Sequence, residues 1–154
     1  MNLKKTIMGI ALIFAPLLAM AQSWPVTVTD RDNRSVTIPQ EPQRIILQDG
    51  RDILALALLE RDDPFAKVVA WNNLPKKQDT ETWNVLKRKW PEAEKILDMQ
   101  FSDQGNVDLE TIISRHPDLM IAQLRAKPSL VQSGVLAKLD ALHIPVVLDR
   151  KSVV

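Results

Sequence analysis

The stretch NVDLETIISRHPDLMIA, residues 106–122, constrains the fold more than any other part of the sequence. Asp108 is a residue type that caps helix N-termini, and apolar residues then recur on one helical face, at Leu109, Ile112 and Ile113. Pro117 ends this helix, because the residue before a proline is driven away from helical backbone geometry. The apolar residues 119–121 that follow are typical of a short buried strand. A capped helix that leads into a buried strand is half of an α/β unit.

The rest of the chain repeats this alternation. Patterning predicts strands at 26–29, 35–38, 44–47, 67–71 and 144–148, and helices at 53–59, 80–90 and 129–142. The first two strands flank the polar residues 30–33, which suits an N-terminal β-hairpin. After the hairpin, the order strand, helix, strand predicts right-handed crossovers and a mostly parallel sheet with helices on both faces.

Two of the predicted helices carry clear packing signals. The helix at 53–59 is apolar nearly all round, which predicts burial on most of its faces. In the helix at 80–90, Trp83, Leu86 and Trp90 fall on one stripe, and we interpret them as core residues in preference to ligand contacts.

The N-terminus has the pattern of a secretory signal peptide. Two lysines at 4–5 precede an apolar run at 7–18, and a small-x-small cleavage site ends at Ala21. The run is shorter than the roughly 20 residues of a membrane-spanning helix and contains Pro16, which disfavours the alternative of a membrane anchor. Residues 1–21 are therefore expected to be removed, and with no cysteine for lipid attachment or disulfides the product should be soluble in a bacterial periplasm.

Composition and motifs exclude several classes of function. The 20 Lys and Arg nearly balance the 19 Asp and Glu and form no basic stripe, so a nucleic-acid partner is not expected. Glycine-rich nucleotide loops, phosphate-binding loops, Gly-x-Ser-x-Gly and paired metal-binding histidines are absent from the sequence. We therefore expect a protein that is not an enzyme and that needs no cofactor.

Several motifs resemble the periplasmic iron-complex and vitamin B12 binding-protein family of ABC importers. That family has a Gly, a helix beginning with a Leu-Glu pair, and Lys-Pro-Asp-Leu before a strand. Here these are Gly105, Leu109-Glu110 and His116-Pro117-Asp118-Leu119, with His in place of the usual Lys. The resemblance extends over about residues 27–148 and implies a Rossmann-like N-terminal lobe at 22–148. In the family, a connecting helix and a second α/β lobe follow, and the ligand is held between the lobes.

The last six residues do not fit this picture. Residues 149–154 neither continue the strand pattern nor match what the family has there. We interpret them as a non-native tail on a truncated lobe, and a genuine short C-terminus is the alternative.

Ligands of open α/β sheets bind beyond the carboxyl ends of the strands. This rule selects as ligand-binding candidates Asp49, Arg51, Trp71, Asn72, Asn73, Arg125 and Lys127. Arg51 begins a helix, where the macrodipole disfavours a cation, so it either binds an anionic ligand or pairs with Asp49 or Asp52. Arg125 and Lys127 raise the same question, with solvated surface as the alternative.

The other candidates also have structural alternatives. Asp49 is better explained as a helix N-cap than as a ligand contact. Trp71 either stacks on a flat ligand or packs in the core. Asn72 and Asn73 either donate to a ligand or serve turn chemistry.

Two further residue types bear on partners. His116 and His143 precede their strands and so lie at the amino edge of the sheet, which argues against a direct metal site. The resemblance implies that Glu110 docks onto arginines of the membrane permease, with first-turn helix chemistry as the alternative.

Together these points predict a monomeric periplasmic solute-binding component of an ABC importer that carries a ferric siderophore or a similar iron chelate. Vitamin B12 and haem are alternative ligands within the family. A secreted doubly wound enzyme is the alternative from another class.

Overall fold

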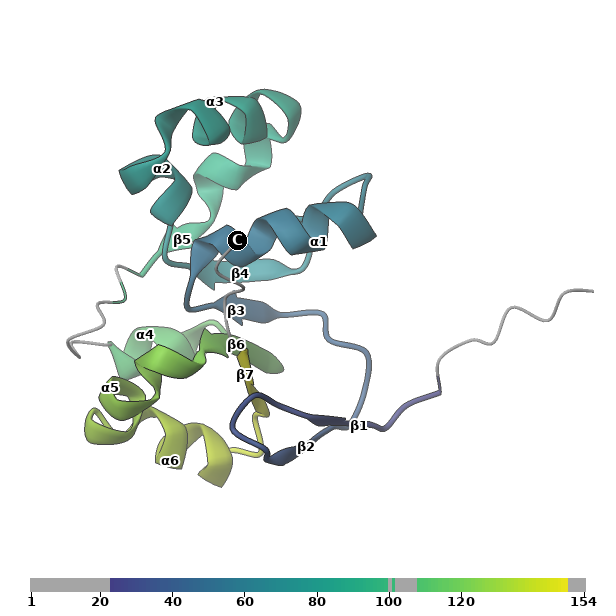
Figure 1. Cartoon of the computed structure of the whole chain (residues 1–154), viewed down its shortest axis with the longest axis vertical. Helices are drawn as coiled ribbons and strands as arrows, with labels where there is room; N and C mark the ends of the chain where they lie inside the picture. Colours follow the sequence, from purple (N-terminus) through teal and green to yellow (C-terminus); the bar gives the residue numbers. More distant parts are fainter. Residues whose placement is uncertain (1–22, 100, 102–107, 150–154) are drawn as a thin grey trace, which may run out of the picture.

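A five-stranded parallel sheet runs through the centre of the chain in the order β5–β4–β3–β6–β7 (Figure 1). The structure is a computed structural model and describes residues 23–99, 101 and 108–149. The strands are β3 Ile45–Leu47, β4 Val68–Trp71, β5 Leu97–Asp98, β6 Leu119–Gln123 and β7 Val146–Asp149. Every pairing recorded within this sheet is parallel, which confirms the predicted α/β class. The predicted signal peptide, Gly105 of the family motif and residues 150–154 lie outside the described residues.

Helices lie on the two opposite sides of this sheet (Figure 1). One side carries α1 Ile53–Leu59, α2 Leu74–Gln78 and α3 Thr80–Lys89, and the other carries α4 Leu109–Ser114, α5 Lys127–Gln132 and α6 Val135–Ala141. Short 3-10 segments are η1 Gly50–Asp52, η2 Pro91–Lys95 and η3 Leu124–Ala126. Asp108 caps α4 by accepting a hydrogen bond from the backbone N–H of Thr111 at 3.1 Å, which confirms the predicted helix start.

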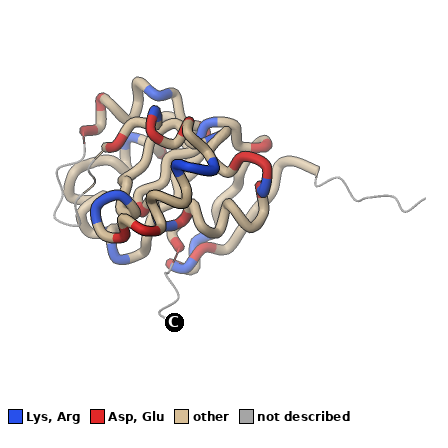
Figure 2. The backbone as a smooth tube through the Cα atoms, turned by 90° about the horizontal axis from the view of Figure 1, so that it is seen from above, with Lys and Arg blue, Asp and Glu red and all other residues tan. Residues whose placement is uncertain are grey.

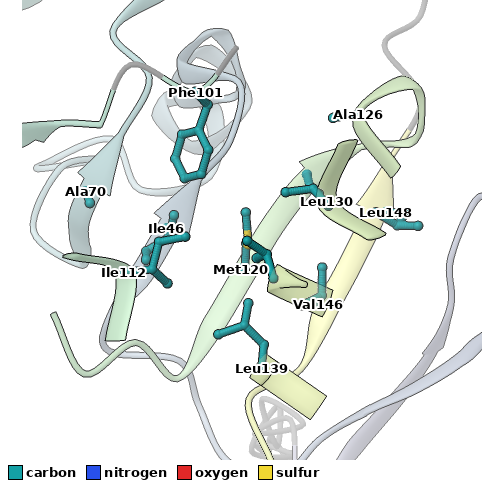
Figure 3. Packing of buried hydrophobic residues seen from close by; sticks show 12 residues of the cluster. Ile46, Ala70, Phe101, Ile112, Met120, Ala126, Leu130, Leu139, Val146 and Leu148 are labelled. Atoms are coloured by element: carbon teal, nitrogen blue, oxygen red, sulfur yellow. The ribbon is translucent and has the colours of Figure 1, made fainter. Parts of the chain in front are cut away.

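Each face of the sheet has its own apolar core. On the α4–α6 side, Met120 from β6 packs among Ile112, Leu130 and Leu139, one from each helix (Figure 3). On the other side, Trp83 and Leu86 of α3 are buried with Ile53 and Phe65, so the predicted core role of the α3 stripe is confirmed for these two residues. Because both faces of the strands are covered, β3 and β6 read in sequence as continuous apolar runs.

The hairpin of β1 Val26–Thr29 and β2 Ser35–Ile38 lies outside this sheet, as its sequence predicts. Its turn is attached to the outer edge of β7. The buried Asp30 carboxylate accepts hydrogen bonds from the backbone N–H groups of Asp32 and Arg34 at 3.0 Å each, and from that of Leu148 at 3.2 Å. The hairpin therefore satisfies backbone groups of an edge strand that would otherwise lack partners.

Three predicted elements are wrong in detail. The single helix expected at 129–142 is two helices, because Gly134 between them has φ +76, a left-handed conformation that suits glycine. The last strand is Val146–Asp149, with Asp149 paired to Gln123, so the predicted strand 144–148 begins two residues too early and ends one residue too early. α1 is not buried on most faces: Leu58 and Leu59 are 73% and 80% exposed.

Charged residues of both signs are interspersed along the described backbone (Figure 2), as the balanced composition predicts. Among the described residues, no helix combines the length and apolar character that a membrane crossing needs.

Candidate functional site

The carboxyl ends of β3 and β6 meet, because these two strands are neighbours in register, with Leu47 opposite Ile121. Asp49 follows β3, Arg51 lies in η1, and Arg125 lies in η3 directly after β6. The sequence rule about strand ends therefore brings three of its candidates to one place. We call Asp49, Arg51 and Arg125 the Asp49 cluster.

The Asp49 carboxylate is the centre of this cluster. It is fully buried and accepts hydrogen bonds from the backbone N–H of Arg51 at 3.0 Å and from Arg51 Nε at 2.8 Å. Arg51 Nη2 contacts its second oxygen, and Arg125 Nη2 lies 3.2 Å from that same oxygen. Asp49 is thus an N-cap of η1 and at the same time the shared partner of two guanidinium groups. The sequence alternatives of an N-cap for Asp49 and an ion pair for Arg51 are both present in the structure.

The electrostatics of the cluster follow from its geometry. Burial alone would raise the pKa of Asp49, but hydrogen bonds and charge from Arg51, with the charge of Arg125, outweigh burial and hold the pKa below its ordinary value. The side chains of Arg51 and Arg125 are 28% and 51% exposed, so each guanidinium combines an interior partner with a solvent-facing side. An anion approaching this edge of the sheet would meet two guanidinium groups that are both held by the buried Asp49.

Three polar residues of the same edge were not among the sequence candidates. Gln48 and Gln123 are each only 2% exposed, and the Gln48 side-chain oxygen accepts the backbone N–H of Gln123 at 3.0 Å. The Gln123 amide in turn donates to both oxygens of Asp52, at 3.0 and 3.2 Å. Burial, then the charge of Asp49, raises the pKa of Asp52 to about 6. The sequence signal for such a network is a glutamine directly after an apolar strand, as at Gln48 and Gln123.

A pocket of about 350 Å³ opens next to this network, between η1–α1 and α2–α3. Arg51 and Asp52 line one side, Leu74 and Pro75 another, and Asp149 closes the end near β7. The pocket therefore joins polar groups of the sheet edge to apolar side chains of two helices.

The candidates at the end of β4 and directly after it are buried. Trp71 is completely buried and packs edge-on against Phe65, with ring centroids 5.4 Å apart, so its core alternative is the one that the structure shows. The side-chain amide of Asn72 donates to the carbonyl of Phe101 at 2.8 Å, and its oxygen accepts from Lys77. Asn73 caps α2 by accepting the backbone N–H of Lys76 at 3.1 Å. In this structure Trp71 is a core residue, Asn72 and Asn73 stabilise the segments after β4, and none of the three belongs to the Asp49 cluster.

Lys127 begins α5 and forms a salt bridge to Asp32 in the hairpin turn. Its ammonium is thus directed to the hairpin and not to Asp49. Sequence position alone could not predict this, because Asp32 lies 95 residues away in the chain.

Glu110 and the histidines lie where the sequence predicts. Glu110 is exposed on the first turn of α4, after the Asp108 cap. His116 lies shortly before β6, and His143 lies shortly before β7. Both are therefore at the amino edge of the sheet, opposite the Asp49 cluster. The described residues contain no group of three His, Cys, Asp or Glu side chains placed to hold a metal ion.

No protein-family model and no curated protein sequence matches the chain, but solved structures do. FepB of Veillonella parvula, a TroA-like periplasmic binding protein, matches 80% of this chain with a TM-score of 0.73 at 20% identity. CeuE of Helicobacter pylori matches 83% with a TM-score of 0.61 at 16% identity. MolA of Haemophilus influenzae matches 81% with a TM-score of 0.59 at 22% identity. The chain therefore shares the fold of part of these periplasmic binding proteins.

The chain spans little more than a third of these proteins: 36% of FepB, 37% of CeuE and 34% of MolA. The Asp49 cluster lies at the carboxyl edge of the sheet, which is the edge at which open α/β folds bind ligands. We call the surface formed by η1, η3 and the adjoining pocket the rim.

Proposed function

We propose that the chain is the N-terminal lobe of the periplasmic solute-binding component of an ABC importer, which captures a ferric siderophore or a similar iron chelate and delivers it to a membrane permease. The observation that carries the ligand class is the pair of guanidinium groups held at the carboxyl edge of the sheet by Asp49. The fold likeness supports the role of capture and hand-over, in which no bond of the ligand changes.

The anionic character of the ligand follows from the chemistry of arginine. A guanidinium presents five N–H donors in a planar fork that matches carboxylate and other oxyanions. Arg51 and Arg125 approach the same Asp49 oxygen, so their charges are close enough to act on one ligand group. The MolA structure was determined with molybdate, an oxyanion, bound. A chelate with carboxylate character fits such a rim.

Haem is the second candidate ligand. HmuT, a haem-binding protein, matches 90% of this chain with a TM-score of 0.50 at 18% identity. Haem carries two propionates, which the same arginine pair would bind, while the apolar wall of Leu54, Leu74 and Pro75 would contact its ring. Both candidates therefore depend on Arg51 and Arg125.

The test of this site is Arg51→Ala, with ferric citrate as the probe and calorimetry as the measurement. We expect binding to weaken by roughly 1.5 to 3 kcal/mol, the range for hydrogen bonds to charged groups. Arg51→Lys should restore only part of it, because an ammonium lacks the bidentate fork. Arg61→Ala, an exposed arginine on the loop after α1, is the matched control and should bind as the wild type does. Equal affinity of Arg51→Ala and wild type, with an intact circular dichroism spectrum, would remove Arg51 from the site.

Glu110 is proposed as the contact to the permease, because it is an exposed acidic residue on the first turn of α4. Charge reversal by Glu110→Arg should leave ferric citrate affinity unchanged and reduce chelate uptake by cells. Glu81→Arg offers a matched control, since Glu81 is an exposed acidic residue in the first turn of α3. Normal uptake with Glu110→Arg would show that docking does not use this residue.

A further inference from the structure

The rim contains a second carboxylate, Asp52, whose partners differ from those of Asp49. Asp49 takes both guanidinium groups. Asp52, three residues later and partly buried, has no salt bridge within the described part of the chain, and its hydrogen-bond donor there is the neutral amide of Gln123. Asp52 therefore has an amide donor where Asp49 has two guanidinium groups.

The groups around Asp52 come from several segments of the chain. Asp49 and Arg51 belong to the same turn, and Gln123 belongs to β6. Asp149 at the end of β7 adds a second nearby negative charge, and it lies 3.8 Å from Arg31 of the hairpin turn. Asp79, Gln78 and Thr82 face Asp52 across the pocket from α2 and α3. At neutral pH the ionised groups close to Asp52 are thus mainly negative.

We infer that Asp52 is a specificity-determining residue of this site: as a carboxylate it opposes the binding of an anion at Arg51 and Arg125, and as a neutral acid it permits that binding. The inference rests on the proposed function, because it concerns the same arginine pair. Asp52 would thus distinguish ligands by their negative charge. Strongly anionic chelates bind best when Asp52 holds a proton, whereas chelates of low charge bind with little dependence on pH.

The physical reason is the local charge balance. When Asp52 is ionised, its negative charge lies in the same turn as Arg51 and lines the same pocket, so an anionic ligand at Arg51 is repelled by it. Protonation of Asp52 removes this charge and turns its carboxyl group into a hydrogen-bond donor. Burial and the charge of Asp49 raise the pKa of Asp52 to about 6, so Asp52 changes its protonation state between pH 5 and pH 7.5.

No other described group at this edge would mimic the effect. The chain has two histidines, His116 and His143, and both lie at the opposite edge of the sheet. The pKa of Asp49 is lowered by its arginine partners despite burial, and hydrogen bonds from Thr82 lower that of Asp79, so these two carboxylates stay ionised above pH 5. A pH dependence between pH 5 and 7.5 that belongs to this rim is therefore assigned to Asp52.

The experiment measures sulfate binding to the chain by chemical-shift titration of its backbone amides at pH 5 and pH 7.5. Sulfate remains a dianion throughout this range, so any change in affinity comes from the protein. We expect the wild-type affinity to fall by roughly tenfold on going to pH 7.5, the order that Coulomb's law gives for one charge near a protein surface. Asp52→Asn should keep the higher affinity at both pH values, because its side chain is neutral and can still accept from Gln123.

Asp79→Asn is the matched control. It removes one charge from the same pocket and retains the cap of α3, since asparagine caps helices as well as aspartate does. It should therefore keep the pH dependence of the wild type. If the sulfate affinity of the wild type did not change with pH, or fell equally in Asp52→Asn, the inference about Asp52 would be overturned. The proposed anion site at the arginines would remain. Absence of sulfate binding at both pH values, or binding that Arg51→Ala does not weaken, would overturn the proposed anion site itself.

Discussion

Asp49 and Asp52 show how position alone separates two identical side chains. Both lie in the turn that follows β3, and both are withdrawn from solvent. Asp49 meets two guanidinium groups, whereas Asp52 meets an amide and a neighbouring negative charge, so their pKa values move in opposite directions from the same starting value. The difference in pKa comes from the partners that each carboxylate meets in the fold, and residue type alone does not determine those partners.

This difference predicts how stability depends on pH. The folded-state pKa of Asp52, about 6, lies above the ordinary aspartate value of 3.8, so the native state binds its proton more tightly than the unfolded chain does. The contribution of Asp52 to stability is therefore full below about pH 4 and is lost as the pH rises through 6. Asp52→Asn should raise the free energy of unfolding at pH 8 by roughly 1 to 3 kcal/mol and have little effect at pH 4. Urea unfolding at both pH values measures this, and a gain of equal size at both would contradict it.

The two described glycines predict different costs for the same substitution. A Cβ on Gly50 would lie 2.1 Å from the carbonyl oxygen of Asn72, which accepts the Gly50 N–H at 2.9 Å. Gly50→Ala should therefore push apart the ends of β3 and β4 and destabilise the chain by roughly 2 to 3 kcal/mol. Gly134→Ala meets open space but has φ +76, and should cost only about 1 to 2 kcal/mol. Thermal unfolding ranks the two, and an equal or reversed order would contradict the close approach at Gly50.

At the scale of elements, α1 offers a direct test of burial. Ile53 is completely buried at its start, while Leu58 is 73% exposed. Ile53→Ala should lower the free energy of unfolding by about 2 to 5 kcal/mol because it leaves a cavity. Leu58→Glu should change it by no more than about 0.5 kcal/mol and should reduce self-association. Urea unfolding with light scattering would check both, and a large loss with Leu58→Glu would mean that this face is covered in solution.

The elements also show which parts of the fold a sequence can predict. Strands such as β3 and β6 are recognisable because burial on both faces leaves a continuous apolar run. The break between α5 and α6 is not, since the apolar spacing continues across it and only the backbone of Gly134 departs from the helix. For the site, strand ends placed Asp49, Arg51 and Arg125 correctly at one edge. The bond from Gln123 to Asp52 depends on contacts across 71 residues of chain, which local pattern cannot show.

At the scale of the molecule, the rim is a surface at the carboxyl edge of the sheet, where the side chains of Arg51 and Arg125 are partly exposed. A separate pocket of about 300 Å³ lies between the hairpin and the β6–β7 face and is lined by Ile121 and Val147. If the proposed function is right, the chain alone should bind ferric citrate far more weakly than a protein in which a second lobe closes over the rim. Calorimetry on the two forms would test this, and equal affinities would show that a second lobe is unnecessary.

The buried carboxylate of Asp49 also limits which anions can bind to Arg51 and Arg125. Because Asp49 is part of the chain, its effective concentration at both guanidinium groups is high, and an external anion that needs the same N–H groups must displace it. Chloride, which offers a single atom, cannot replace two hydrogen-bonded oxygens. A polydentate oxyanion can contact both arginines while Asp49 keeps its place. The rim should therefore ignore ordinary salt and respond to ligands by the number and spacing of their oxygens, a selectivity that competition between chloride and sulfate would measure.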